Sequence, residues 1–272
     1  MYLWRKSAGL QWCKSHEDLL QARSLGQLVI VRRPARKRLE LQIACRSRSA
    51  SSALLKEFGG RIETLPRNWL NRFVRADSKP IKIGKRLIIS SVEATSVSQL
   101  SRHNGRSLIV IPASLAFGTG GHATTAMSHR LLEQLTRGWN PGWSLVDLGS
   151  GSGILALAAR CFGAGRVIGI DNDPTAMLVA KSNARLNKIP GAVFQLCDVH
   201  KWNAAQKPDV ITANLYSDLL VKILPKLRGS GWLIVSGILR SQKDDLVHAL
   251  QRNHLQVTSI KHCGKWIAML AR

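Results

Sequence analysis

The segment VDLGSGSG at residues 146–153 constrains the fold of this chain more than any other feature. An apolar run of strand length, residues 144–148, is followed by Gly149, Gly151 and Gly153 and then at once by an apolar helical run. Glycines allow a tight turn and let backbone N–H groups approach a ligand, as they do at the carboxyl ends of parallel strands. We therefore predict a strand, a ligand-binding loop and a helix of an α/β domain.

The downstream sequence repeats this alternation and predicts a Rossmann-like parallel sheet covered by helices. Strands are expected at residues 144–148, 166–171, 193–197, 209–214 and 232–236, with helices at 154–162, 174–187, 218–227 and 242–253. Asp173 before Pro174 is a helix start, since aspartate caps free N–H groups and proline suits the first helical position. The last runs, 255–263 and 265–271, predict an antiparallel pair at one edge of the sheet.

The upstream sequence predicts a smaller α+β domain. Its expected order is strand, helix, two strands, helix and strand within residues 1–90, which is a ferredoxin-like unit. The polar, serine-rich residues 91–106 are expected to form a linker. Residues 107–272 would then hold the Rossmann-like domain, and a chain beginning near Ser107 should fold alone.

The net charge of +24 is unusually high and is concentrated upstream. Residues 1–106 carry 22 Lys and Arg against 7 Asp and Glu, and residues 107–272 carry 18 against 9. Such a field favours polyanionic partners, so RNA and ribosomal particles are candidate surroundings. The alternative is that surface Lys and Arg serve only solubility.

The cysteines and the hydropathy pattern bear on metal binding and on the cellular compartment. Five cysteines lie singly in the chain, without a CxxC pair, which argues against a disulfide framework and against a zinc site (Cys13, Cys45, Cys161, Cys197 and Cys263). No metal is therefore expected. There is no run of 18 uncharged apolar residues, and charges interrupt the first 20 residues before a signal-peptide core forms. We expect a cytoplasmic protein without a membrane partner.

Three acids at successive strand ends distinguish between candidate cofactors. Asp147 stands two residues before Gly149, where a negative charge would repel a pyrophosphate but attract the cationic amino-acid part of S-adenosylmethionine. Asp171, 22 residues after Gly149, could accept both ribose hydroxyls, a role also found in dehydrogenases. Asp198 could accept the adenine amino group. Ordinary turn or helix-cap roles are the alternative for Asp171 and Asp198.

Two further segments carry candidate site residues. The glycines of AFGTGGHATT at residues 116–125 suggest a lid, and its threonines, including Thr125, are expected to cap the following helix. His122 is either a loop residue held for structure or a base. The other histidines, including His129, are expected at the surface or at an edge. Asn214 ends the fourth strand, where it could face a transferred methyl group or form a turn.

These segments together resemble the PrmA family, the methyltransferases of large-subunit ribosomal protein 11. The resemblance rests on FGTGGHATT, VDLGSGSGILALAA, GIDNDP, ANL and SGIL, and extends more thinly to NWLNRF and PIKIGKRLII. It implies a class I methyltransferase fold and S-adenosylmethionine as cofactor, with Thr125, Gly149, Asp171 and Asn214 at cofactor-contacting positions. The chain departs from the family at Gly121 and Ala123, where a threonine and a proline are usual, and in its unusually basic N-terminal domain.

The resemblance implies transfer of methyl groups to lysine or N-terminal amino groups of that ribosomal protein, with ribosomal RNA nearby. Asn214 would orient the amine, and Thr125, Asp147, Gly149, Gly151, Gly153, Asp171, Asp198 and Asn214 would hold the cofactor. One alternative is an enzyme that methylates RNA or another basic protein, although ANLY at residues 213–216 lacks a clear NPPY-type base-stacking motif. The other is an RNA-binding ribosome assembly factor without activity.

Overall fold

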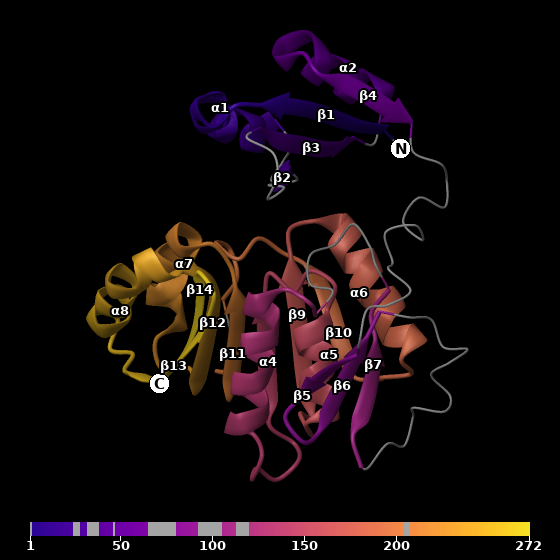
Figure 1. Ribbon diagram of the computed structural model, residues 1–272. Helices are drawn as coiled ribbons and strands as arrows, with labels where there is room; N and C mark the ends of the chain where they lie inside the picture. The colour runs from indigo at the N-terminus through magenta and orange to yellow at the C-terminus, as the bar shows by residue number, and fades with distance from the viewer. Residues whose placement is uncertain are drawn as a thin grey trace. The chain divides into compact units, whose positions relative to one another are not determined.

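The computed structural model describes residues 2–23, 28–31, 38–45, 47–64, 80–91, 105–112, 120–203 and 207–272. The chain divides into two compact units, Met1–Phe73 and Val74–Arg272, called unit 1 and unit 2 below (Figure 1). No helix among the described residues is long and apolar enough to span a membrane.

Unit 1 has the predicted ferredoxin-like order. Its elements are β1 (Tyr2–Ala8), α1 (Leu10–Arg23), β2 (Leu28–Val31), β3 (Leu39–Cys45), α2 (Arg48–Phe58) and β4 (Arg61–Thr64). The strands form an antiparallel sheet in the order β2-β3-β1-β4. Trp4, which is fully buried, packs edge-on against Phe58 and donates a 2.8 Å hydrogen bond to the carbonyl of Gly59. The core of unit 1 is therefore its own.

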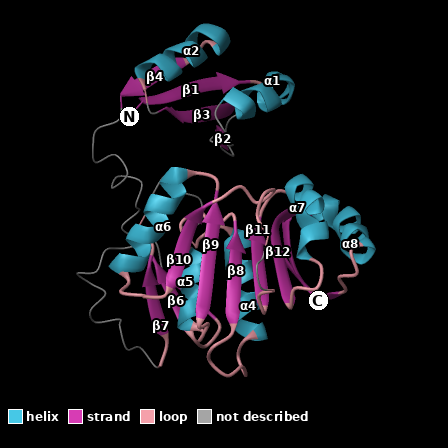
Figure 2. Cartoon of the chain, turned by 180° about the vertical axis from the view of Figure 1, so that it is seen from behind, coloured by secondary structure: helices cyan, strands magenta, loops and turns pink. Residues whose placement is uncertain are grey.

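Unit 2 contains the predicted Rossmann-like sheet (Figure 2). From residue 123 onward, its elements are α4 (Ala123–Leu135), β8 (Ser144–Leu148), α5 (Ile154–Cys161), β9 (Arg166–Asp171), α6 (Pro174–Leu186), β10 (Ala192–Leu196), β11 (Val210–Asn214), α7 (Ser217–Ile223), a 3-10 helix (Leu224–Leu227), β12 (Trp232–Leu239), a second 3-10 helix (Arg240–Gln242), α8 (Lys243–Arg252), β13 (Val257–Cys263) and β14 (Trp266–Ala271). The strand order is β10-β9-β8-β11-β12-β14-β13. The first five strands are parallel, and the last two form the expected antiparallel pair.

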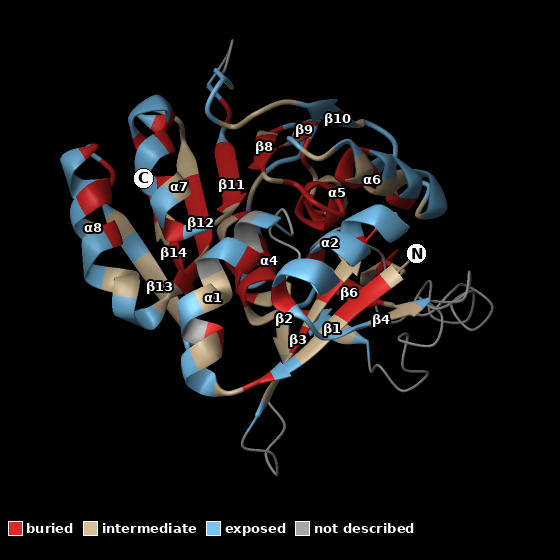
Figure 3. Cartoon of the chain, turned by 90° about the horizontal axis from the view of Figure 1, so that it is seen from above, coloured by how far each residue is buried: buried red, intermediate tan, exposed pale blue. Residues whose placement is uncertain are grey.

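Successive strand residues of the sheet face two separate cores. In β8, Leu145 packs with residues of α4, α5 and α6, whereas Val146 packs with residues of α7 and α8. Both side chains are almost fully buried, as are most of β11 and β12 (Figure 3). Burial on both faces explains the continuous apolar runs of these strands. It also leaves the strand ends as the places where polar side chains can reach a ligand.

The division between the units differs from the expected domain boundary at residue 90. β5 (Ile81–Ile83), β6 (Leu87–Ser90) and β7 (Ser107–Val110) form a small sheet that belongs to unit 2. Ile83, Leu87 and Ile89 are buried in the core that also contains α4 and α5. A chain beginning at Ser107 would lose these side chains, so the self-folding fragment is expected to start near Val74. Residues 92–104 of the expected linker lie outside the described residues.

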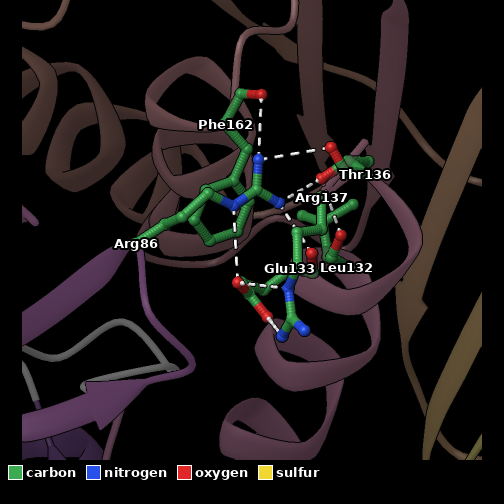
Figure 4. A network of polar contacts seen from close by, with 6 residues as sticks. All are labelled: Arg86, Leu132, Glu133, Thr136, Arg137 and Phe162. Carbon is green, nitrogen blue, oxygen red and sulfur yellow. Dashed lines mark hydrogen bonds and ion pairs between the residues drawn. The ribbon is translucent and has the colours of Figure 1, made fainter. Parts of the chain in front are cut away.

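Arg86, between β5 and β6, joins this small sheet to α4 and α5 (Figure 4). Its guanidinium donates hydrogen bonds to the carbonyl of Glu133 at 2.7 Å and to the Thr136 hydroxyl at 2.7 Å, and lies 4.3 Å from the centre of the Phe162 ring. Its Nε is 3.4 Å from the Glu133 carboxylate, which also accepts a 2.7 Å hydrogen bond from Arg137. We call Arg86, Glu133 and Arg137 the arginine clamp.

Candidate functional site

The glycine loop between β8 and α5 has the predicted turn. Gly149, Gly151 and Gly153 have φ values of 70°, 55° and 79°, in the left-handed region that favours glycine. A Cβ at Gly149 would lie 2.4 Å from a Leu215 methyl carbon, and one at Gly153 would lie 2.8 Å from the Phe194 ring. Glycine is therefore required here both by backbone conformation and by packing against neighbouring strands.

Asp171, the last residue of β9, faces this loop. Its Oδ2 accepts a 2.9 Å hydrogen bond from the Gly151 amide, and its Oδ1 accepts a 3.0 Å bond from the Asp173 amide. Asp173 caps α6 as predicted, because its carboxylate accepts a 2.8 Å bond from the Thr175 amide. The Asp171 side chain is half-buried and each carboxylate oxygen has further acceptor capacity, so it can also hold ligand hydroxyls.

Asp198 follows β10 and is also half-buried. Its Oδ1 accepts a 2.8 Å hydrogen bond from the His200 amide, which is the turn role weighed as the alternative. A bond of 2.9 Å from the Cys197 amide to the Asp171 carbonyl holds the ends of β10 and β9 together. The two acids therefore lie at neighbouring strand ends, on the same edge of the sheet as the glycine loop.

Asn214 and Thr125 are brought together although they are 89 residues apart. The Asn214 amide, at the end of β11, donates a 3.3 Å hydrogen bond through Nδ2 to the Thr125 hydroxyl of α4. Thr125 is 1% exposed, whereas Asn214 is half-buried. Thr125 is thus placed to hold the Asn214 amide in one orientation, with Oδ1 left as its acceptor atom.

Asp147 lies deeper than the other acids. It is 1% exposed, and its Oδ1 accepts a 2.6 Å hydrogen bond from the Thr212 hydroxyl on the neighbouring strand β11. Its Oδ2 is buried without a hydrogen-bond partner among the described residues. Burial raises the pKa of Asp147 to about 6, against the lowering effect of the Thr212 bond. A cation at Oδ2 would favour the charged form of this carboxyl group.

The prediction that threonines cap α4 was wrong. The N-cap residue is His122, which makes no side-chain cap bond, so the threonines do not cap the helix. Thr124 and Thr125 lie inside its first turn, where the Thr124 hydroxyl is 2.7 Å from His122 Nδ1. His122 also packs edge-on against Trp266 at 5.2 Å, which supports its structural role. Residues 116–119 of the expected lid lie outside the described residues.

His129 was expected at the surface or at an edge but is fully buried. Its Nδ1 is 2.7 Å from the Thr125 carbonyl oxygen, and its Nε2 is 3.4 Å from the Ile154 carbonyl oxygen. Burial lowers its pKa to about 4, so the ring is neutral near pH 7. It links the turn of α4 that carries Thr125 to the start of α5. The apolar Leu132, one turn further along the same face of α4, is the signal that could have indicated its burial.

The arrangement suits a small organic cofactor. The positive-φ glycine loop, the half-buried acids Asp171 and Asp198 and the unpartnered Oδ2 of Asp147 lie at or below the carboxyl edge of one sheet, where open α/β sheets bind ligands. Within the part of the chain that the structure describes, no group of three or more His, Cys, Asp or Glu side chains is placed to hold a metal ion.

Comparison with known proteins identifies similar chains. Residues 38–272 match the family of ribosomal protein L11 methyltransferase (PrmA). Proteins of that name from Pelotomaculum thermopropionicum and Pelobacter propionicus are 35% and 36% identical to this chain over 75% and 73% of its length. The matches cover 65% and 64% of those two proteins, so the chain spans slightly less than two thirds of their length. The crystal structure of a ribosomal protein L11 methylase from Lactobacillus delbrueckii subsp. bulgaricus has a TM-score of 0.61 and 28% identity, and covers 71% of this chain and 97% of its own.

Proposed function

Because this chain belongs to the PrmA family, we propose that it transfers methyl groups from S-adenosylmethionine to amino groups of ribosomal protein L11. The observation that carries the proposal is the placement of Asp171. Its half-buried carboxylate, at the end of β9, is fixed by the Gly151 amide of the glycine loop, which is where the ribose of such a cofactor would be held. Asp198 would accept the adenine amino group, and Oδ2 of Asp147 would face the cofactor's ammonium group.

We assign to Asn214 the role of orienting the acceptor amine. When bound, S-adenosylmethionine supplies a methyl group on a positively charged sulfur, and displacement at that carbon requires a neutral amine aligned with it. Because Nδ2 of Asn214 donates to Thr125, its Oδ1 can accept a hydrogen bond from the amine. A lysine with a pKa near 10.4 costs about 4 kcal/mol to deprotonate near neutral pH, and desolvation at the site would supply part of that. No protein nucleophile is needed.

Unit 1 is proposed as the substrate-recognition domain. It has its own core and its own sheet. A domain of this kind raises the effective concentration of a macromolecular acceptor at the catalytic sheet. The proposed substrate also implies a cytoplasmic enzyme that works close to ribosomal RNA.

The acceptor class can be tested with a labelled methyl group. Incubation of the enzyme with labelled S-adenosylmethionine and ribosomal particles should label a protein band that survives ribonuclease and disappears with protease. The initial rate should rise about tenfold per pH unit below the amine pKa, because the neutral fraction of the amine rises. Label that disappears with ribonuclease would instead support RNA methylation, and the absence of label in both would support an inactive assembly factor.

Replacing Asn214 with alanine should lower turnover by about 10- to 100-fold, since the lost hydrogen bond to the acceptor is worth about 1–3 kcal/mol. Cofactor affinity, measured by calorimetry, should change much less. Asn140→Ala is the matched control. Asn140 is exposed and precedes the first residue of β8, whereas Asn214 is the last residue of the parallel strand β11, so the two asparagines lie at opposite ends of the sheet's strands. Equal losses of turnover and of affinity would assign Asn214 to the cofactor alone.

A further inference from the structure

The end of the seven-stranded sheet opposite the proposed cofactor site carries a row of exposed cations. Six of the seven strands have an exposed Lys or Arg at this end, in the loop next to the strand or at its first residue: Lys188 at β10, Arg166 at β9, Lys207 at β11, Arg228 at β12, Arg272 at β14 and Arg252 at β13. We call these six residues the basic edge. Neighbouring strands are about 4.8 Å apart, so six steps across the sheet span about 29 Å.

Most of the described acids of unit 2 lie at the carboxyl ends of the strands, opposite the basic edge. Seven of these acids follow the carboxyl ends of strands or lie in the first turn of a helix that does (Asp147, Asp171, Asp173, Asp198, Asp218, Asp244 and Asp245). Near the basic edge, Glu133 is buried between two arginines. Asp209, which is exposed, also lies near this edge, and the hydrogen bonds of 2.7 and 2.8 Å that it accepts from the amide and hydroxyl of Ser144 do not cancel its charge. Among the described acids of unit 2, one exposed carboxylate therefore lies near the six cations, so the field of the basic edge remains positive.

Helix termini account for only half of this row. Arg252 lies in the last turn of α8, Lys188 directly follows the C-cap of α6, and Arg228 is the C-cap of the 3-10 helix, all positions where a helix dipole favours a cation. Arg166, Lys207 and Arg272 are not at helix ends. Some of the side chains are also held in place. Arg228 donates a 3.0 Å hydrogen bond through Nε to Asn253, and the Arg272 guanidinium lies 5.3 Å from the centre of the Trp232 ring.

We propose that the basic edge binds the phosphate backbone of a single RNA strand, independently of the cofactor site. A row of cations about 29 Å long matches a flexible chain of regularly spaced negative charges, and phosphate contacts of this kind need no base sequence. A lipid surface fits less well, since stable membrane attachment needs a second, apolar signal. Among the exposed large apolar side chains of described unit 2, Leu186 and Val193 are near this end, whereas Leu178, Leu196 and Tyr216 lie toward the other. RNA bound here would leave the carboxyl edge open to a protein acceptor.

The test compares two triple variants of the full chain with equal charge change. Lys188→Gln/Lys207→Gln/Arg252→Gln removes three cations of the basic edge. Lys181→Gln/Lys222→Gln/Lys243→Gln removes one lysine each from α6, α7 and α8, of which Lys181 and Lys222 are exposed and Lys243 is half-buried. The probe is a fluorescent 20-nucleotide RNA of mixed sequence. The first triple should weaken binding by about 100-fold near 0.1 M salt and reduce the slope of log affinity against log salt by about 2. The second should change affinity by less than about threefold.

Two further measurements complete the test. S-adenosylmethionine should bind equally well with and without saturating RNA, because the two sites lie at opposite ends of the strands. Binding to vesicles containing anionic lipid, which the net charge of +24 favours in any case, should fall equally in the two triples. Equal losses of RNA binding in the two triples, displacement of the cofactor by RNA, or a loss of binding to anionic vesicles confined to the first triple would each overturn the proposal. Because none of these readouts uses methylation, failure of the proposed activity would leave this result interpretable.

Discussion

Asp171→Ala is expected to weaken binding of S-adenosylmethionine by about 30- to 1000-fold, which corresponds to about 2–4 kcal/mol. The carboxylate would lose its bonds to the ribose hydroxyls, and the Gly151 amide would lose the acceptor that now lies 2.9 Å away. Both effects act on the same ligand, since one removes direct contacts and the other loosens the loop that forms them. Calorimetric titration with the cofactor and with its demethylated product measures the loss.

Asp173→Ala is the matched control for this prediction. Asp173 lies two residues further along and caps α6, so its loss should reduce stability by about 1 kcal/mol while cofactor affinity stays nearly unchanged. Asp171→Asn should give an intermediate affinity, because the amide oxygen can still accept one hydrogen bond. Unchanged cofactor affinity in folded Asp171→Ala protein would remove Asp171 from the site and with it the main support for the proposed cofactor.

The parallel sheet could be predicted from sequence because its local and long-range signals agree. β8 and β9 have the residue bounds expected of them, since each is an apolar run that ends at a glycine or an aspartate. Burial on both faces keeps these strands continuously apolar, and the glycine loop fixes where β8 ends. The βαββαβ order of unit 1 was likewise predicted correctly.

The small sheet of β5, β6 and β7 was missed because its signal is not local. β6 pairs with β7 in parallel across 20 residues, from Leu87 to Ser107, and a short parallel strand has no turn signal that joins it to its partner. One local signal was present. Two apolar runs flank Gly84, whose positive φ of 53° marks the β5–β6 turn. The missed strands moved the unit boundary from residue 90 to residue 73.

The positions of the candidate residues could be predicted where they are strand ends. The sequence pattern placed Asp171, Asp198 and Asn214 at strand ends, and the structure has them at the carboxyl ends of β9, β10 and β11, on one edge of the sheet. The links between elements could not be predicted, because the bond from Asn214 to Thr125 depends on how α4 packs on β11. His129 is a similar case, since its burial depends on the approach of α5 to α4.

Glu133→Gln is expected to lower the free energy of unfolding by about 3–5 kcal/mol, the usual cost of removing one partner from a buried ion pair. The Glu133 side chain is 1% exposed, and its charge compensates Arg86, which is mostly buried against the carbonyls of α4. Arg137→Met should cost much less, because Arg137 is half-exposed at 53%. Urea denaturation of the three proteins measures the differences. Similar losses in both variants would mean that Arg86 does not depend on Glu133.

The effect of Glu133→Gln should also depend on pH, in a direction set by the arginine clamp. Burial alone would raise the pKa of Glu133, but hydrogen bonds and charges from Arg137 and Arg86 outweigh it and hold the pKa below its usual value. The stabilisation is therefore fully present above the pKa of unfolded glutamate, near 4.3, and is lost as the pH falls through the lower folded value. The difference between wild type and Glu133→Gln should be constant from pH 6 to 8 and should shrink below about pH 4.5. A difference that stays constant down to pH 3 would show that Glu133 acts through packing rather than charge. Because Glu133 lies near the end of α4 and Thr125 near its start, the folded variant should bind the cofactor with unchanged affinity.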